Sequence, residues 1–250
     1  MVSAQPYLFL LGGHDLEMLT IKQLLQEHRL DFVDRNLPWG AKLSHYQDLL
    51  TDVRTLVGIE LTEDIAPPAN YIRIDHHNEL SHLSSSIEQL ADLLGITLSL
   101  HQQLVAANDK GYIPAMQALG ARADQIQEIR RLDRKSQGVT EQDEALAETS
   151  IQTNLSVVGG VTVVKSLTPK FSPITDRLFG LHPNRLLVYT DTVLNYYGEN
   201  VQVVTAYFAE FIQQKRAYAG GGETGFFGFI GENASEVTQV KEQIIAMVAV

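Results

Sequence analysis

One short stretch of the sequence, Asp75-His76-His77, places a carboxylate directly beside two imidazoles. It follows Tyr71-Ile72-Arg73-Ile74, a pattern typical of a short strand. Open α/β sheets bind their ligands outside the carboxyl ends of the strands, and carboxylate and imidazole are ligands for divalent cations. We therefore predict a metal site at this strand end. The alternative is a polar turn with solvated side chains.

Other acidic and histidine side chains follow other apolar runs: His14, Asp15 and Glu17 after residues 7–11, Glu60 after residues 55–59, and Asp109 after a helical pattern over 98–107. If the strands are parallel, their ends converge on one edge of the sheet. Two carboxylates and an imidazole per ion suit a two-metal hydrolase, whose ions lie roughly 3.5–4 Å apart. The alternatives are first-turn helix acids for Asp15 and Glu17, an acidic loop for Glu60 and a turn residue for Asp109.

The elements that must position these side chains alternate between strand and helix. Strand patterns cover 7–11, 30–33, 55–59 and 71–74. The helical patterns between and after them include a face of Met18, Ile21, Leu25 and His28, and a helix with Ser85 and Glu88 at capping-box spacing. This alternation predicts an α/β fold with a doubly wound, mostly parallel sheet.

In the rest of the chain, the predicted secondary structure changes twice. Residues 115–150 are charged and helical in spacing, and strand patterns return at 160–164, 185–189 and 201–205. Helical patterns over 207–218 and 237–250 end the sequence. We expect a metal-binding domain over 1–114, a helical connector over 115–150, and a second, smaller α/β domain over 151–250.

Composition narrows the classes of function. The chain has 250 residues and no cysteine, so any metal must be held by oxygen and imidazole, which suits Mn, Mg, Fe or Zn. With a net charge of −11, the protein is a poor candidate for binding long duplex nucleic acid, which requires Lys and Arg at the phosphates. The sequence has no signal-peptide pattern and no apolar stretch that could cross a membrane, so we expect a cytoplasmic protein without a membrane partner. A homodimer is compatible with the sequence.

Four stretches together resemble the DHH phosphoesterase superfamily, which includes family II pyrophosphatases, RecJ-type exonucleases and small-oligonucleotide or cyclic-dinucleotide phosphodiesterases. They are Ile74–Asn78 (IDHHN), the acidic strand end at Glu60, Ala106–Tyr112 (AANDKGY), and Ala219–Phe229 (AGGGETGFFGF). The last stretch resembles the glycine-rich signature of the DHHA1 substrate-binding domain. The order of these motifs covers essentially the whole chain.

The resemblance implies a role for each matching residue. His14 and Asp15 would hold one metal ion, Glu60 would bridge, and Glu17, His76 and Asp109 would hold a second ion. Asp75 would orient a histidine, and His77 would act as general acid or as a donor to a phosphoryl oxygen. Gly220, Gly221 and Gly222 would offer backbone N–H groups to a phosphate or nucleotide. The expected cofactor is a divalent cation, Mn²⁺ first and Mg²⁺ as the alternative, with two ions in an intact site.

The sequence departs from the family pattern at three places. The first motif is compressed to His14-Asp15-Leu16-Glu17, Glu60 stands where an Asp is usual, and Glu223 stands where a His is usual. The expected function is hydrolysis of a small phosphorylated substrate, such as a short oligonucleotide, a dinucleotide or a nucleotide phosphate, by a metal-activated water. The alternatives are a degenerate protein that binds a nucleotide or phosphate without catalysis or serves as a subunit of an assembly, and a pyrophosphatase-like enzyme.

Overall fold

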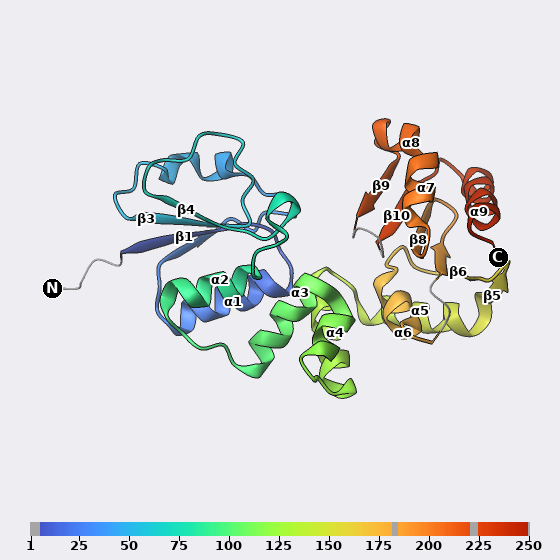
Figure 1. Cartoon of the computed structure of the whole chain (residues 1–250), viewed down its shortest axis with the longest axis horizontal. Helices are drawn as coiled ribbons and strands as arrows, with labels where there is room; N and C mark the ends of the chain where they lie inside the picture. The colour runs from blue at the N-terminus through green and yellow to red at the C-terminus, as the bar shows by residue number, and fades with distance from the viewer. Residues whose placement is uncertain (1–5, 182–184, 221–224, 250) are drawn as a thin grey trace. The chain divides into compact units, whose positions relative to one another are not determined.

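The computed structural model describes residues 6–181, 185–220 and 225–249. The chain divides into two compact units, Met1–Gly138 (unit 1) and Val139–Val250 (unit 2). Each unit has its own sheet (Figure 1). The two-domain α/β fold expected from the sequence is therefore confirmed.

Unit 1 is built from four strands and the helices that follow them: β1 (Tyr7–Leu11), α1 (Leu16–Glu27), β2 (Phe32–Asp34), η1 (Leu43–Leu49), β3 (Thr55–Ile59), β4 (Tyr71–Ile74), η2 (Asn78–Leu80), α2 (Ser86–Leu94), α3 (Leu100–Ala118) and α4 (Ala123–Ser136). All strand pairs are parallel, in the order β2-β1-β3-β4. The strands predicted over 7–11, 55–59 and 71–74 have these bounds, and the strand predicted over 30–33 lies at 32–34.

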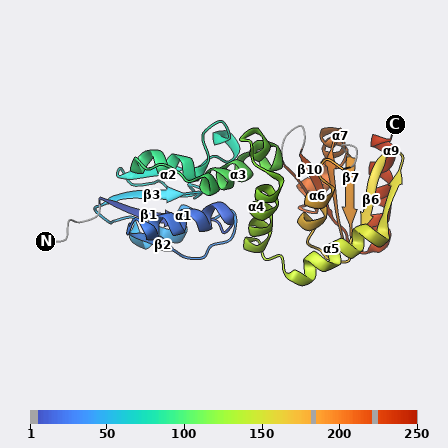
Figure 2. The same cartoon turned by 90° about the horizontal axis from the view of Figure 1, so that it is seen from below.

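The unit 1 sheet buries both of its faces, as continuous apolar strands require. Phe9 and Val57 pack with α1, α2 and α3 on one face, while Leu8 and Leu56 pack with Tyr46 of η1 on the other. Figure 2 shows α1 and α2 beside the strands. Because the chain crosses from β2 to β3 over the opposite face, the strand order reverses between β1 and β3. Open α/β sheets bind ligands at such a switch point.

Gly12 lets the ends of β1 and β3 approach each other closely. A Cβ at this position would overlap the backbone carbonyl oxygens of Ile59 and Glu60. The next residue, Gly13, has room, because its nearest neighbour would be the Cα of Trp39 at 3.5 Å. The switch point is therefore tight at Gly12 and open at Gly13.

Local capping fixes where the helices of unit 1 begin. Asp15 caps α1 by accepting a hydrogen bond from the backbone N–H of Met18 at 2.8 Å. The predicted capping box of Ser85 and Glu88 is present at the start of α2. The predicted apolar face of α1 extends one position too far, because His28 is the exposed C-cap residue of this helix.

Unit 2 contains a mixed six-stranded sheet in the order β5-β6-β7-β8-β10-β9. Its elements are α5 (Glu141–Asn154), β5 (Leu155–Val158), β6 (Val161–Lys165), α6 (Ser172–Leu178), β7 (Arg185–Tyr189), β8 (Val193–Gly198), α7 (Val201–Tyr207), α8 (Ala209–Gln213), β9 (Ala217–Gly220), β10 (Phe226–Ile230) and α9 (Ala234–Val248). One face packs against α7 and α9, and the other against α5 and α6.

Two sequence-based expectations differ from this arrangement. The strand predicted over 201–205 is helix α7, because Val201 and Val204 lie one helical turn apart and are both buried in the unit 2 core. The helices of the predicted connector over 115–150 divide between the units: α4 packs on α3 and α1, whereas α5 packs on α6 and β6.

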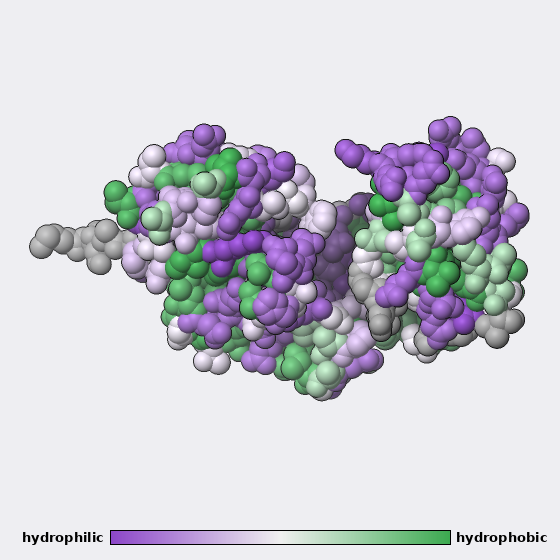
Figure 3. All heavy atoms as spheres, turned by 45° about the horizontal axis from the view of Figure 1, so that its top comes forward, coloured by the Kyte–Doolittle hydropathy of each residue, from purple (hydrophilic) through white to green (hydrophobic). Residues whose placement is uncertain are grey.

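Hydrophilic residues occupy much of the face shown in Figure 3, with smaller hydrophobic areas between them. Among the described residues, none of the helices has the length and apolar character that crossing a membrane requires.

The contrast between Gly12 and Gly13 gives a matched test of the packing at the switch point. Gly12→Ala should lower the free energy of unfolding by about 1–3 kcal/mol, because its methyl group forces two backbones apart. Gly13→Ala should change it by less than about 1 kcal/mol. Urea unfolding followed by circular dichroism measures both. Equal stability of the two variants would contradict the close approach.

Candidate metal centre

Glu17 lies in the first turn of α1 with a fully buried side chain. Its Oε1 accepts a hydrogen bond from the backbone N–H of Ile87, in the first turn of α2, at 3.0 Å. That bond satisfies one otherwise unpaired helix donor. Its Oε2 remains free and lies 3.5 Å from Nε2 of His76. Glu17 therefore joins two helices and still turns one oxygen toward the strand ends.

Glu60, His76 and Asp109 meet at the same place from β3, β4 and α3. Nε2 of His76 lies 2.6 Å from Oδ2 of Asp109 and 3.9 Å from Oε1 of Glu60. Glu60, His76, Asp109 and His77 each offer one ligand atom, and these atoms all lie within 4.8 Å of one another. This convergence is the one expected for parallel strand ends at a switch point.

The converging atoms lie close together, but their hydrogen bonding is poor. Four of them are buried without a well-directed partner among the described residues: Glu17 Oε2, Glu60 Oε1, His76 Nε2 and Asp109 Oδ2. Leaving buried polar atoms unpaired costs roughly 1–3 kcal/mol each, and more for charged groups. Three carboxylate oxygens and one imidazole nitrogen would all be satisfied by a single divalent cation. The residues of this site fit such an ion.

The electrostatics of the cluster lead to the same conclusion. Burial raises the pKa of Glu60 well above its usual value, and the neighbouring carboxylates of Asp15 and Glu17 raise it further. Burial also raises the pKa of Asp15 to about 6. Burial alone would lower the pKa of His76, but Asp109 and Glu17 outweigh it and raise this pKa to about 10. The cluster therefore carries more negative charge than positive charge, and the proton on His76 neutralises only part of the excess.

His77 is held by Asp75. Oδ1 of Asp75 accepts from the backbone N–H of His77 at 2.9 Å and lies 3.0 Å from its Nδ1, while Oδ2 accepts from Arg73 at 2.6 Å. Burial alone would raise the pKa of Asp75, but the hydrogen bonds from His77 and Arg73 outweigh it and lower it. The Asp75 carboxylate in turn raises the pKa of His77. Its Nε2 is left to bind a cation or to donate a proton.

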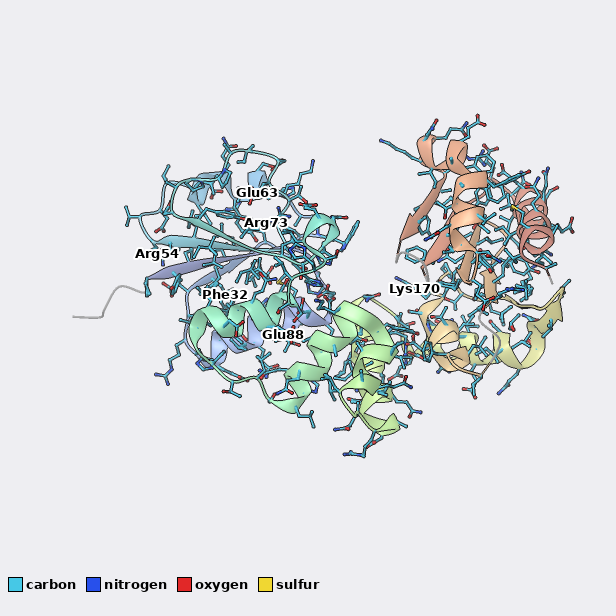
Figure 4. All side chains as sticks on the ribbon, in the orientation of Figure 1. Phe32, Arg54, Glu63, Arg73, Glu88 and Lys170 are labelled. Atoms are coloured by element: carbon cyan, nitrogen blue, oxygen red, sulfur yellow. The ribbon has the colours of Figure 1, made fainter. Side chains whose placement is uncertain are left out.

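Figure 4 labels Glu88 on α2, on one side of the sheet, and Arg73 on the other side. Arg73 therefore supports Asp75 from the face opposite the helices. The sequence does not indicate this support, because Arg73 has the pattern of an ordinary polar residue in a strand.

Asp109 is positioned by a break in α3. Gly111 and Tyr112 leave helical geometry, Tyr112 with φ 58° and ψ −148°, and Pro114 follows. Arg130 of α4 covers the ring of Tyr112 at 4.5 Å and donates to Asn108 at 2.9 Å and to Asp133 at 2.6 Å. This buried assembly fixes the turn of α3 that carries Asp109. The sequence prediction missed it, because only the folded chain brings α3 and α4 together.

Not every residue assigned from the sequence joins the cluster. His14 is exposed and lies outside the converging group, because α1 begins directly after Asp15 and leaves His14 on the solvent side of the cap. Asp15 uses Oδ1 for capping, yet it is close enough to raise the pKa of Glu60. Gly220 ends β9, whereas Gly221 and Gly222 lie outside the described residues.

Comparison with solved structures identifies the architecture. The pGpG-specific phosphodiesterase PggH from Vibrio cholerae aligns over 98% of both chains with a TM-score of 0.52 and 10% sequence identity. The chain has the fold of this phosphodiesterase. RecJ from Thermus thermophilus in complex with Mn²⁺ aligns over 97% of this chain and 52% of its own, with a TM-score of 0.49 and 11% identity. Another exonuclease RecJ, bound to manganese, aligns with a TM-score of 0.45 and 10% identity, over 97% of this chain and 90% of that one.

A scan of protein-family models finds no match, and no curated protein sequence matches either. The two-domain fold that the resemblance to the DHH superfamily implies is therefore confirmed. Within this fold, the cluster of Glu17, Glu60, His76 and Asp109 lies at the switch point between β1 and β3.

The Arg130 assembly predicts a large effect on stability. Arg130→Met should lower the free energy of unfolding by about 3 kcal/mol, because it removes the guanidinium that pairs with Oδ2 of the buried Asp133 carboxylate. Arg130→Met combined with Asp133→Leu should regain most of that loss. Arg131→Met is the matched control, since Arg131 pairs with Glu128 at the surface, and it should cost less than about 1 kcal/mol. Urea unfolding measures all three. If Arg130→Met lowers the free energy of unfolding no more than Arg131→Met does, the Arg130 assembly does not stabilise the protein as described.

The charge of the cluster predicts a pH dependence that a cation removes. A carboxyl with a higher pKa in the folded chain than in the unfolded chain makes folding less favourable as pH rises through the interval between the two values. For Glu60 this interval opens at its ordinary value of 4.5. In chelator, Glu60→Gln should therefore be more stable than the original chain at about pH 8 and closer to it at about pH 5.

The same pair of proteins tests for the cation. Mn²⁺ at 100 times its dissociation constant should stabilise the original chain by about 2.7 kcal/mol. It should stabilise Glu60→Gln much less. Urea unfolding at both pH values, with chelator or Mn²⁺, measures these differences. If Mn²⁺ stabilises both proteins equally, the cation does not bind at Glu60.

Proposed function

We propose that this protein is a divalent-cation-dependent phosphoesterase that acts on a small phosphorylated substrate. The observation that carries this proposal is a set of four buried ligand atoms without a well-directed hydrogen bond at the switch point of a DHH fold, Glu17 Oε2, Glu60 Oε1, His76 Nε2 and Asp109 Oδ2. Since Glu60, His76, His77 and Asp109 offer ligand atoms within 4.8 Å of one another, with Glu17 Oε2 3.5 Å from His76, and His14 is exposed, we propose one cation at this group and no second ion held by His14.

A bound divalent cation supplies a water of lowered pKa and neutralises charge on a phosphoryl group. The residues of this chain supply position and proton transfer. Glu17 and Asp109 are fixed by α2 and by the Arg130 assembly, so their oxygens need little rearrangement. His77 is held through Nδ1 by Asp75 at 3.0 Å, and its Nε2 donates a proton to a phosphoryl or leaving-group oxygen. The raised pKa of His77 keeps this proton available at higher pH.

The proposed substrate class is supported by charge and by the neighbouring fold. A net charge of −11 disfavours long nucleic acid, whose phosphates would have to be neutralised by the protein. PggH is described as specific for pGpG. Short 5′-phosphorylated dinucleotides are therefore the first substrates to test. Because carboxylate oxygens dominate the donor set, Mn²⁺ and Mg²⁺ are the first ions to test, with Mn²⁺ preferred for the imidazole of His76.

One observation favours a second candidate function. His14 is exposed, so the first motif does not add its imidazole to the cluster. A chain with a single cation and no hydrolytic activity would bind a nucleotide or phosphate without cleaving it. The two candidates share the cation and differ in turnover.

Variants of the adjacent residues His76 and His77 distinguish binding of the cation from proton transfer. With Mn²⁺ and pGpG, His77→Ala should lower kcat by about 100- to 1,000-fold while Mn²⁺ content stays unchanged. His76→Ala should lose both Mn²⁺ and activity, because His76 lies at the centre of the cluster. His82→Ala is the matched control at an exposed histidine and should leave both unchanged.

Metal analysis of the purified proteins and release of mononucleotide measure these effects. Loss of Mn²⁺ in His77→Ala would instead make His77 a ligand. Bound Mn²⁺ without turnover of dinucleotides or pyrophosphate would favour the binding function over hydrolysis.

A further inference from the structure

The loop after β2 carries the only tryptophan of the chain, Trp39, and leaves it 81% exposed. Most tryptophans bury their rings, because the ring contributes a large apolar area. Trp39 lies at the carboxyl edge of the sheet, on the same edge as the cation cluster. Its Cα would be 3.5 Å from a Cβ at Gly13, next to Gly12 and its contact with Glu60.

The backbone on both sides of Trp39 is anchored. Leu37 packs into the core beneath η1, and Ala41 is buried there with its carbonyl accepting from Thr62 at 2.9 Å. Before them, the N–H of Asn36 donates to Asp34 at 2.7 Å. The chain therefore holds the position of Trp39 firmly but does not pack its indole. A ring presented on a held backbone loses little entropy when it binds a partner.

The two glycines set an upper limit on the distance between the backbones of Trp39 and Glu60, and this limit is within the span of a nucleotide. Through Gly12 and Gly13, the Cα of Trp39 lies within roughly 13 Å of the Glu60 carbonyl oxygen, since consecutive Cα atoms are 3.8 Å apart. The indole extends from that point into solvent. Val53, which is 97% exposed, lies before β3 at the opposite, amino edge. Of these two exposed apolar side chains, only Trp39 comes from the edge of the sheet at which the cluster lies.

We propose that Trp39 stacks on the base of a nucleotide whose phosphate lies at the cation cluster, which makes nucleotides the substrate class. This inference rests on the proposed function for the phosphate position. Base–aromatic stacking needs only a planar ring, so it tolerates any base. The indole is neutral, so it recognises the base without adding to the negative charge of the protein. An inorganic phosphate or pyrophosphate has no ring to stack and would gain nothing from Trp39.

Because Trp39 is the only tryptophan, its fluorescence reports binding at this residue directly. In Mn²⁺, GMP should quench the emission, whereas ribose 5-phosphate, which has the same phosphate and sugar but no base, should not. Quenching by both compounds alike, or by neither, would overturn the proposal. This measurement needs no turnover.

Variants at Trp39 test the effect on catalysis. Trp39→Ala should raise KM for pGpG by about 5- to 100-fold and leave kcat within about twofold, because stacking acts on binding. Trp39→Phe should recover most of the loss. Val53→Ala is the control at an exposed apolar residue away from the cluster and should change neither constant. Circular dichroism checks that all variants fold.

The outcomes separate this inference from the proposed function. If pGpG is hydrolysed and Trp39→Ala leaves KM unchanged, the phosphoesterase function stands and the stacking role is overturned. If nothing is hydrolysed, but GMP quenches Trp39 and ribose 5-phosphate does not, the stacking role stands and the chain is a nucleotide binder. A dinucleotide analogue with no bases should show no difference between the original chain and Trp39→Ala. A similar loss with that analogue would contradict base recognition.

Discussion

Three buried carboxylates around one imidazole are the constraint on which unit 1 depends. Glu17, Glu60 and Asp109 repel one another, and burial removes the water that would screen them. The proton on His76 offsets only part of this cost. A fold that keeps such a group sacrifices stability at that point, and proteins do this mainly where function requires it. A divalent cation reverses the balance, because the same oxygens then become ligands instead of repelling charges.

The surrounding structure gives several of these residues a second task. Glu17 uses one oxygen at the start of α2 and keeps the other for the cluster. Asp15 caps α1 with one oxygen while its charge acts on Glu60. Arg130 joins the break in α3 to α4. Because capping and packing already hold these side chains, the donors are in place before any ion or substrate arrives, which is what preorganised sites need.

The sequence was sufficient for the parts that depend on local patterns. The continuous apolar runs of β1 and β3 and the short apolar alternation of β4 predicted the bounds of these strands, and therefore the strand ends that bring Glu60 and His76 together. Prediction failed where long-range packing decides: Val201–Thr205 is β-branched yet forms a helix, since Val201 and Val204 share one buried face. The compressed first motif did not indicate that His14 is exposed. The Arg130 assembly could not be predicted either, because it depends on the packing of α4 against α3. The closeness of Trp39 to Gly13 likewise depends on the fold, because the two residues are far apart in the sequence.

The glutamate at position 60, where the DHH pattern usually has the shorter aspartate, bears on how the cluster is built. Glu60 adopts φ +54°, a left-handed conformation that is rare for a residue with a side chain, immediately after β3. Its amide still bonds to the carbonyl of Ile74 at 2.8 Å, so the strand pairing is intact up to the turn. Strained backbone persists where the surroundings over-determine it and often marks functional sites. The turn at Glu60, pressed against Gly12, directs a longer side chain back into the cluster, where its Oε1 lies 3.9 Å from His76. The departure at position 60 therefore preserves a donor at the switch point, whereas the departure at His14 removes one. Together they leave one group of converging side chains, at which we propose a single cation, beside the loop that carries Trp39.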